Sequence, residues 1–409
     1  MHPALFATAL VAALLTAPAV AAPLSLATAL DRAVQRSEAA RAARASALSA
    51  SETAQAAAQL PDPTVRAGID NLPVTGADRL RTTPDSMTMK RIGISQEWLS
   101  REKRDARRAA AEAMVGKESV QARIAAADAR LQTALAYLDA FYAAQALQLT
   151  ALMEHHAHEE YEAARARLAS ATGGSDEVLK LAAARGIVED ESAELRQQES
   201  AARVALERWI GMPASGLDPV GNLPAPSESE YVAGDPMVVA LQREVDVARG
   251  AAAVAASNRR PNWTWEVSYG QRTGYSDMVS VGVSIPLPIA PAARQDRETA
   301  SRLALAVKAE AELAEATRAA TADYLSAMSD ARRLEARIQR YREVVLVPAE
   351  QRTAAATAAY RSNQTTLVTL FEARHAEVDV QRKLLTLQRD LAKRQAQLAY
   401  RPIASGGGP

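Results

Sequence analysis

The sequence of 409 residues contains no cysteine, so disulfides, thiolate metal sites, cysteine nucleophiles and acylation of an N-terminal cysteine are excluded. Neither sign of charge is in excess, because 48 basic residues balance 48 acidic ones, which leaves no surplus to neutralise nucleic-acid phosphates. Aromatic residues make up only 4%, while alanine is abundant, a composition that favours long, closely packed helices. Phosphate-binding loops and serine-hydrolase motifs are also missing, so we expect neither an enzyme nor a cofactor.

One apolar run stands out, from Leu5 to Val20, and small residues follow at its end. Ala19-Val20-Ala21 fits the small-x-small pattern of cleavage, so residues 1–21 are predicted to be a signal peptide, cleaved after Ala21 or Ala22. The alternative is an uncleaved membrane anchor, for which the run is short. We therefore expect an exported chain in which strands make any membrane crossing.

Two short segments alternate between apolar and small or polar residues, which is the period of a β-strand. They lie between Pro261 and Pro288 and turn near Thr273–Asp277. Each has about ten residues, enough to cross a bilayer when tilted. The hairpin by itself also fits the surface of a soluble α+β protein, but the chain offers no second sheet to cover its apolar face. We predict that this face contacts lipid through Trp263, Trp265, Val267, Tyr269, Val279, Val281, Val283 and Ile285.

The order of elements occurs twice along the chain, as a helix, two strands and a long helical hairpin. The first helix is expected over about residues 24–60, Ser100 is placed to cap the long helix after the first hairpin, and Pro348 is expected to kink the long helix of the second copy. Three landmarks recur at spacings of 189 to 200 residues, which predicts an internal duplication: Pro61 with Pro261, Gly93 with Gly282, and Gly174 with Asn363. The expected organisation begins with a signal peptide (1–21) and a first repeat (22–210), which contains a β-hairpin (63–98) and a helical hairpin (99–210). A connector (211–234) leads to the second repeat (235–400), which contains a β-hairpin (262–288) and a helical hairpin (291–400). A flexible tail (401–409) follows.

Heptad-spaced leucines in both helical hairpins, such as Leu131 with Leu138 and Leu384 with Leu391, indicate coiled-coil packing. Four strands are too few for a barrel, since about eight is the minimum, and membrane sheets do not tolerate open edges. Three copies would supply about twelve strands. The expected fold class is therefore mainly α with a membrane β-barrel: a long α-helical coiled-coil barrel plus four strands per chain, which gives a 12-stranded barrel in a homotrimer.

Several short stretches mark the joints between these elements. Residues 59–64 (QLPDPT) lead into the first strand, Arg260-Pro261 leads into the third, and residues 281–288 (VGVSIPLP) leave the fourth. Residues 206–226, with WIGMP at 209–213, form the connector. In this order they resemble the TolC-like outer-membrane efflux factors over essentially the whole chain after the signal peptide. Residues 94–104 most resemble the CzcC-like subgroup, which is paired with heavy-metal cation pumps.

The resemblance implies a passive homotrimeric duct in the Gram-negative outer membrane, with a long periplasmic extension. It implies contact with outer-membrane lipid, a periplasmic adaptor (a membrane fusion protein) and an inner-membrane RND-type pump. No nucleic acid is expected as a partner. The cargo implied is heavy-metal cations, with drugs or proteins of type I secretion as alternatives. The rival reading is a periplasmic coiled-coil adaptor or scaffold without a barrel, which would need a β-rich lipoyl-like domain that the sequence does not supply.

The family's functional tip is a pair of helix–turn–helix ends, which match residues 167–179 and 360–373 here. The resemblance implies a periplasmic entrance formed by Tyr360, Thr369 and Glu372, of which only Glu372 is acidic, so one carboxylate ring is expected instead of two. Thr365 stands where the family often has an arginine. The adaptor contacts implied at the tips are Gly173, Gly174, Asp176, Glu177, Asn363 and Thr365.

Histidines and glutamates gather at residues 154–160. His155 and Glu159 share a helix face at i,i+4, and imidazole with carboxylate suits zinc, cobalt or nickel. A solvated helix face is the favoured interpretation, so no metal site is expected, and His155, His158 and Glu159 are the candidate ligands if there is one. His375 lies one turn past Glu372 and is expected to face the lumen or an adaptor.

Overall fold

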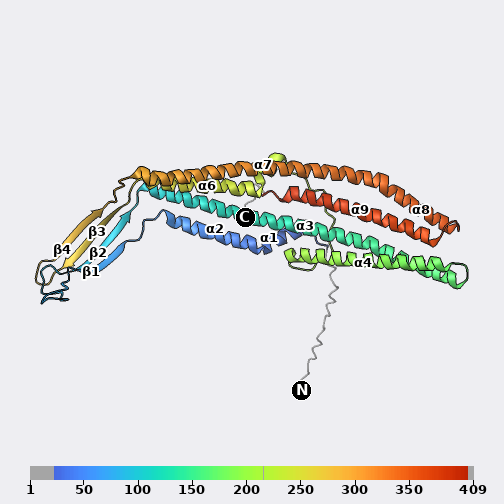
Figure 1. Cartoon of the computed structure of the whole chain (residues 1–409), viewed down its shortest axis with the longest axis horizontal. Helices are drawn as coiled ribbons and strands as arrows, with labels where there is room; N and C mark the ends of the chain where they lie inside the picture. Colours follow the sequence, from blue (N-terminus) through green and yellow to red (C-terminus); the bar gives the residue numbers. More distant parts are fainter. Residues whose placement is uncertain (1–22, 215, 404–409) are drawn as a thin grey trace, which may run out of the picture. The chain divides into compact units, whose positions relative to one another are not determined.

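The computed structural model describes residues 23–214 and 216–403, so the expected signal peptide and the end of the tail lie outside them. The strands are β1 (Thr64–Asp70), β2 (Met89–Trp98), β3 (Trp263–Gln271) and β4 (Met278–Ser284). The helices, shown in Figure 1, are α1 (Leu26–Arg36), α2 (Glu38–Ala57), α3 (Arg101–Ala169), α4 (Ser175–Ile210), α5 (Glu228–Gly234), α6 (Pro236–Ser257), α7 (Gln295–Tyr341), α8 (Val347–Arg361) and α9 (Leu367–Tyr400), with a short 3₁₀ turn η1 (Pro291–Ala293) and a π turn η2 (Arg342–Leu346). None of the helices among the described residues combines the length and the apolar character needed to cross a membrane.

The chain forms two compact units, and each draws on distant parts of the sequence. Unit 1 takes residues up to 33, 133–221 and 346–386, and unit 2 takes 34–132, 222–345 and the residues from 387 onward. Unit 1 therefore contains all of α4 and α8, the second part of α3 and the first part of α9. Unit 2 contains the sheet, α2, α6 and α7. Each unit combines segments from both halves of the chain.

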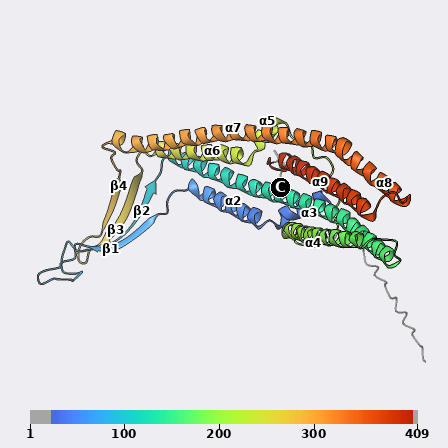
Figure 2. The ribbon, with the colours of Figure 1, turned by 45° about the vertical axis from the view of Figure 1, so that its right-hand side comes forward.

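The four strands form one antiparallel sheet in the order β1-β2-β3-β4 (Figures 1 and 2). Both predicted hairpins are confirmed, and β2 and β3 join them, with Trp98 opposite Trp263 and Lys90 opposite Gln271. β4 ends at Ser284, so Ile285, which the sequence placed in the strand, lies beyond it. Within the described chain β1 and β4 each pair on one side only, which leaves the sheet with two open edges.

Two long helices begin where their first residues predict. The Ser100 hydroxyl accepts a hydrogen bond from the Lys103 N–H at 3.2 Å, which confirms the N-cap of α3. A carboxylate oxygen of Asp235 accepts from the Met237 N–H at 2.9 Å at the start of α6. Pro236 fills the first turn of α6, where its missing N–H has no partner to lose.

Two helix boundaries differ from the sequence-based expectation. The single helix expected over residues 24–60 is interrupted, because the Ser37 hydroxyl caps a new helix, α2, by accepting from the Ala40 N–H at 3.2 Å. The connector over 211–234, in which no helix is assigned from the sequence, contains α5, which starts with a capping box between Ser227 and Glu230. The spacing S-x-x-E in the sequence is the signal that would have revealed this helix.

The expected kink near Pro348 is present as a change of helix type. The π turn η2 ends at Leu346, and Pro348 lies in the first turn of α8. Proline lacks an N–H and its ring crowds the carbonyl four residues earlier, so the regular hydrogen-bond ladder cannot continue through it.

Unit 1 is held by two apolar clusters. One joins α3, α4 and α9 and includes the buried side chains of Met153, Leu181 and Phe371. The other joins α1, α3 and α4 and includes Tyr137 and Leu206, both fully buried. These clusters fix the helical hairpins of unit 1 against one another.

The hydroxyl of Tyr137 is satisfied by backbone inside the second cluster. It lies 2.6 Å from the carbonyl oxygen of Leu24 and 2.8 Å from that of Asp218. Burial raises the pKa of this phenol to about 12. The contact ties the start of the described chain to the connector that follows α4.

In unit 2, α6 packs along α7, and it approaches α3 closely at Gly250. The Arg249 guanidinium of α6 pairs with the Glu310 carboxylate of α7 at 2.6 Å. At Gly250 a Cβ atom would lie 2.9 Å from the Cα of Ala110 in α3, so only glycine permits this approach.

Candidate functional site

Apolar side chains cover one face of the sheet and remain exposed. In β3, Trp263 and Tyr269 are 39% and 44% exposed, whereas Ser268 on the opposite face is 4% exposed. All the predicted lipid-facing residues are exposed except Trp265, which is half-buried. The strand register places one apolar row across all four strands: Val65, Ile94, Val267 and Val281.

The apolar face also contains residues of the first hairpin that are not among the predicted lipid contacts. Val65, Ile69, Ile92 and Trp98 of β1 and β2 are all exposed. Their alternation in the sequence already places them on one face of each strand. Because the first hairpin is less apolar than the second, the prediction of lipid contact is confined to the second.

The opposite face of the sheet is small and polar. Gly93 of β2 faces Ser268 of β3 so closely that a Cβ at Gly93 would lie 2.7 Å from the Ser268 Cβ. Arg91 and Asp70 form an ion pair between β2 and β1 at 3.0 Å. The sheet is therefore amphipathic, with one wide apolar face and one polar face.

A buried lysine of α3 joins this helix to the sheet. Lys103 is 4% exposed, and its ammonium donates to the Arg260 carbonyl at 3.0 Å and to the Asn262 side-chain oxygen at 2.7 Å. The Asn262 amide in turn donates to the Glu97 carboxylate at 2.7 Å. Burial lowers the pKa of Lys103.

The α3–α4 and α8–α9 turns share one pattern of backbone hydrogen bonds. In each turn two N–H groups reach back to carbonyls of the last helical turn at 2.8–3.0 Å: Ala171 to Leu168 and Thr172 to Arg167 in the first, Asn363 to Tyr360 and Gln364 to Ala359 in the second. Ala171 and Asn363 both have positive φ, 57° and 60°, as a Schellman cap requires.

The equivalent positions of the two turns are thus 192 residues apart (171 to 363), so the sequence-based pairing of Gly174 with Asn363 is wrong. Gly174 is instead the extended N-cap of α4.

The predicted entrance residues lie at the start of α9 and the end of α8. Glu372 is exposed, and its charge adds to the raised pKa of Lys180, whose main cause is a hydrogen bond with Asp176. Tyr360 packs against the first apolar cluster of unit 1. The Thr369 N–H donates to the Thr366 hydroxyl at 3.3 Å, which makes Thr366 the cap of α9.

The predicted tip contacts divide between exposed and structural positions. The Glu177 carboxylate accepts from the Leu367 N–H of α9 at 3.1 Å and lies 3.7 Å from the Arg167 guanidinium. The Gly173 N–H donates to the Arg167 carbonyl at 3.0 Å. Gly174, Asp176 and Asn363 are exposed, and Thr365 is half-buried.

A buried carboxylate joins α3 to α9 in unit 1. Glu160 is 4% exposed, and one of its oxygens accepts from the Arg374 guanidinium at 2.7 Å. Its other oxygen is buried without a hydrogen-bond partner within the described residues. Burial raises the pKa of Glu160 to about 7, although the positive charge of Arg374 acts in the opposite direction.

A second polar contact joins α4 to α9. The Arg382 guanidinium donates to Glu191 at 2.8 Å, and His375 Nε2 lies 3.3 Å from the other Glu191 oxygen. Asp379 lies 3.8 Å from His375 Nδ1. The structure packs His375 half-buried against Phe371, with the two rings stacked at 5.6 Å, and so places it between helices.

The candidate metal ligands from residues 154–160 do not all come together. His155 Nε2 lies 3.3 Å from a Glu159 oxygen, and His156 Nδ1 lies 3.4 Å from the other. His158 is exposed and makes neither a hydrogen bond nor an ion pair with another described residue. Glu154 turns toward α4, where it accepts from the Ser192 hydroxyl at 2.6 Å.

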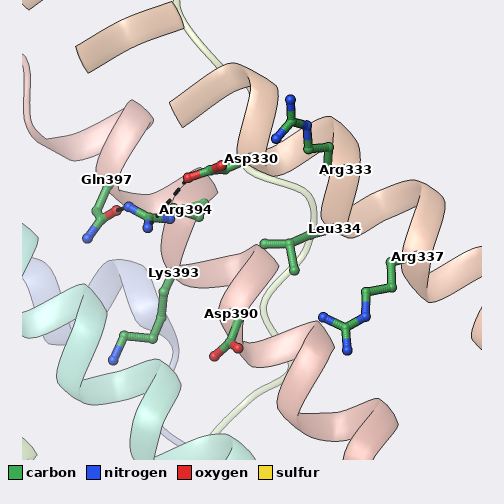
Figure 3. A pocket seen from close by; sticks show the side chains of 8 residues that line it. All are labelled: Asp330, Arg333, Leu334, Arg337, Asp390, Lys393, Arg394 and Gln397. Atoms are coloured by element: carbon green, nitrogen blue, oxygen red, sulfur yellow. Dashed lines mark hydrogen bonds and ion pairs between the residues drawn. The ribbon is translucent and has the colours of Figure 1, made fainter. Parts of the chain in front are cut away.

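A groove of about 490 Å³ lies between α7 and the end of α9 in unit 2 (Figure 3). It is lined by Asp330, Arg333, Leu334, Arg337, Asp390, Lys393, Arg394 and Gln397. Arg394 points at Asp330 across the groove, at 3.6 Å. Cationic side chains outnumber carboxylates in the lining, so the groove favours acidic groups over metal cations.

No family model and no curated protein matches the chain. The fold does match solved structures. The outer membrane protein VceC of Vibrio cholerae has a TM-score of 0.75 and 18% identity, over 92% of this chain and 96% of its own. A membrane protein from Pseudomonas aeruginosa has a TM-score of 0.76 and 15% identity, over 92% and 90%. The outer membrane channel MtrE of Neisseria gonorrhoeae, in its open state, has a TM-score of 0.74 and 17% identity, over 92% and 88%. The fold resemblance drawn from the sequence is thereby confirmed.

Proposed function

We propose that this chain, which shares the fold of the TolC-like outer-membrane efflux channels, is the outer-membrane component of a tripartite efflux system. It serves as a passive duct and catalyses no reaction. An inner-membrane pump of the RND type supplies the energy, and a periplasmic adaptor connects pump and duct. The observation that carries the proposal is the sheet, with its exposed apolar face and two open edges.

The sheet explains why three copies are required. In lipid every backbone N–H and C=O needs a protein partner, so the free edges of β1 and β4 cannot face hydrocarbon. Pairing β4 of one copy with β1 of the next removes both edges, and three copies yield a barrel of about twelve strands. The apolar row with Val267 and Val281 then faces lipid, and the face with Gly93 and Ser268 lines the lumen.

The helical tips supply the periplasmic entrance and the adaptor contacts. In a trimer the exposed Glu372 of each copy forms one ring of carboxylates, and Thr369 adds no charge one turn earlier. The exposed residues of the two turns, Asp176 and Asn363 among them, are available to an adaptor. Dilation of this entrance by the partners opens the duct.

Heavy-metal cations are the proposed cargo, and the support is the resemblance of residues 94–104 to the CzcC-like subgroup. Drugs and secreted proteins are the alternatives, because cargo selection lies largely with the pump. Deletion of the gene should sensitise cells to zinc, cobalt, cadmium or copper if metal is the cargo. Sensitivity to antibiotics alone would assign a drug pump instead.

The experiment that tests the duct is membrane fractionation followed by mass and stoichiometry in detergent. We expect recovery in the outer membrane as a trimer whose chains lack about 21 residues, as the signal pattern predicts. Recovery as a soluble periplasmic protein would overturn the barrel and support a coiled-coil scaffold.

A further inference from the structure

One histidine and two carboxylates converge between α4 and α9, apart from the sheet and the predicted entrance residues. Glu191 comes from α4, and His375 and Asp379 come from α9, one turn apart. One ligand atom from each lies within 4.8 Å of the other two. Among the described residues this is the one group of three such side chains gathered closely enough to hold a metal ion.

We propose that Glu191, His375 and Asp379 bind a divalent transition-metal ion that links α4 to α9. The closest pair already has the required separation. Zinc–nitrogen and zinc–oxygen bonds of about 2.0–2.2 Å place two tetrahedral ligands roughly 3.3–3.5 Å apart. His375 Nε2 and Glu191 Oε1 are separated by 3.3 Å. Asp379 Oδ2 lies 3.8 Å from Nδ1, the other ring nitrogen. The Asp379 side chain is more than half exposed, so it can rotate toward the Nε2 side to complete the set.

The packing around His375 fixes its ring and leaves its Nε2 atom able to bind an ion. The imidazole of His375 stacks on Phe371 with an interplanar angle of 13°, which fixes the direction of the ring. His375 Nε2 is buried and makes no hydrogen bond within the described chain. Its contact with Glu191 Oε1 at 3.3 Å is an ion-pair distance without hydrogen-bond geometry, so the two atoms face each other as two ligands of one ion would.

Arg382 orients both carboxylates through the oxygens that the ion does not use. Its guanidinium contacts Glu191 Oε2 at 2.8 Å and Asp379 Oδ1 at 3.6 Å. Glu191 Oε1 and Asp379 Oδ2, the oxygens nearest His375, stay free of the guanidinium. Partners of this kind orient the ligands of many metal sites.

The ligand types select the ion. One imidazole with carboxylates suits zinc, cobalt or nickel, whereas magnesium and calcium prefer sites built from oxygen alone. The ion would join a helix from the first half of the chain to one from the second half, because α4 and α9 contribute different ligands. Binding would therefore stabilise unit 1.

The test uses the purified full-length trimer in detergent, without a histidine tag. His155, His156 and His158 are first replaced together by alanine. His375 is then the only histidine that remains beyond residue 22. Titration of this protein with Zn²⁺ in a calorimeter should show one ion bound per chain, and Mg²⁺ should give no binding. Zn²⁺ at a hundredfold excess over its Kd should also raise the thermal midpoint, since a ligand of the folded state stabilises it.

His375→Ala and Glu191→Gln in this background should each weaken Zn²⁺ binding at least tenfold. Glu377→Gln is the matched control on α9, because the Glu377 carboxylate pairs with Gln381 outside the cluster. X-ray absorption of the bound Zn²⁺ should report an imidazole nitrogen ligand. In the background protein only His375 can provide it, so this measurement needs no further variant. Absence of Zn²⁺ binding in the background protein, or unchanged binding after His375→Ala, would overturn the proposal whether or not the duct function holds.

Discussion

Among single residues, Glu160 shows how folding alters the chemistry of a side chain. Its carboxyl is buried between α3 and α9 with Arg374 as its partner on one oxygen only. The effect of burial is larger than the opposing effect of the Arg374 charge, and it raises the pKa of Glu160 from 4.5 to about 7. Because the folded state then holds the proton more tightly than the unfolded state, the stabilisation from this group is complete below pH 4.5 and is lost as the pH rises through about 7.

Glu160→Gln should flatten the pH dependence of stability. The wild-type chain should lose up to about 3 kcal/mol between pH 4.5 and 7 from this group, and the variant should not. The thermal midpoint of the helical circular dichroism, followed across this range, measures the difference. Glu162→Gln, at an exposed position of α3 that pairs with Arg165 at 3.4 Å, is the control and should keep the wild-type slope. An identical slope in Glu160→Gln would contradict the pKa assignment.

At the scale of elements, the helices differ in how closely they approach their neighbours. Gly250 of α6 lies against the backbone of Ala110 in α3, whereas Gly186 of α4 has open space around it. Both glycines lie inside helices, where glycine costs about 1 kcal/mol relative to alanine. The same substitution should therefore have opposite effects at the two positions.

Gly186→Ala should stabilise the protein by about 0.5–1 kcal/mol. Gly250→Ala should destabilise it by about 1–3 kcal/mol, because the new methyl group would lie 2.9 Å from the Ala110 Cα and force α6 away from α3. Thermal unfolding of the two variants side by side measures both effects. A stabilised Gly250→Ala variant would show that α6 and α3 are not in close contact.

The sheet allows a similar comparison between its two faces. Val281 and Ser280 are neighbours in β4, and the pleat points them to opposite faces. Val281→Arg should cost about 2–4 kcal/mol if that face meets the bilayer centre, whereas Ser280→Arg should be tolerated in an aqueous lumen. The yield of trimer in the outer membrane measures the cost, and equal yields for the two variants would argue against lipid on the apolar face.

At the scale of the whole molecule, the proposed duct needs an entrance that closes. In the proposed trimer one ring of Glu372 carboxylates would give that entrance its charge, because position 369 holds an uncharged threonine. Ion selectivity and resting conductance should therefore depend on one residue per chain.

Glu372→Ala should loosen the closed entrance and raise the resting single-channel conductance of the trimer in planar bilayers. It should also reduce the preference for cations, because the ring of negative charge is removed. Thr369→Ala is the control at the uncharged position and should change neither quantity. Conductance and selectivity equal to those of the wild type would exclude Glu372 from the entrance.

Much of the fold could be read from local patterns. Alternation predicted β3 and β4, and Ser100 predicted the start of α3 because a cap acts on residues three positions away. The interruption at Ser37 and the helix α5 were missed, although capping residues marked both. The candidate site was harder to predict: periodicity identified the apolar sheet face, while the tip residues rested on a family resemblance.

The sequence by itself determined the alternating faces of the strands and the extent of the long helices, because these depend on neighbours only a few residues away. It could not place His375 beside Glu191, nor bury Glu160 with Arg374, because these pairs lie 184 and 214 residues apart (191 to 375 and 160 to 374). Only the packing of α9 against α3 and α4 brings them together. That packing turns ordinary helix charges into a buried carboxylate of raised pKa and gathers the three residues of the proposed metal site.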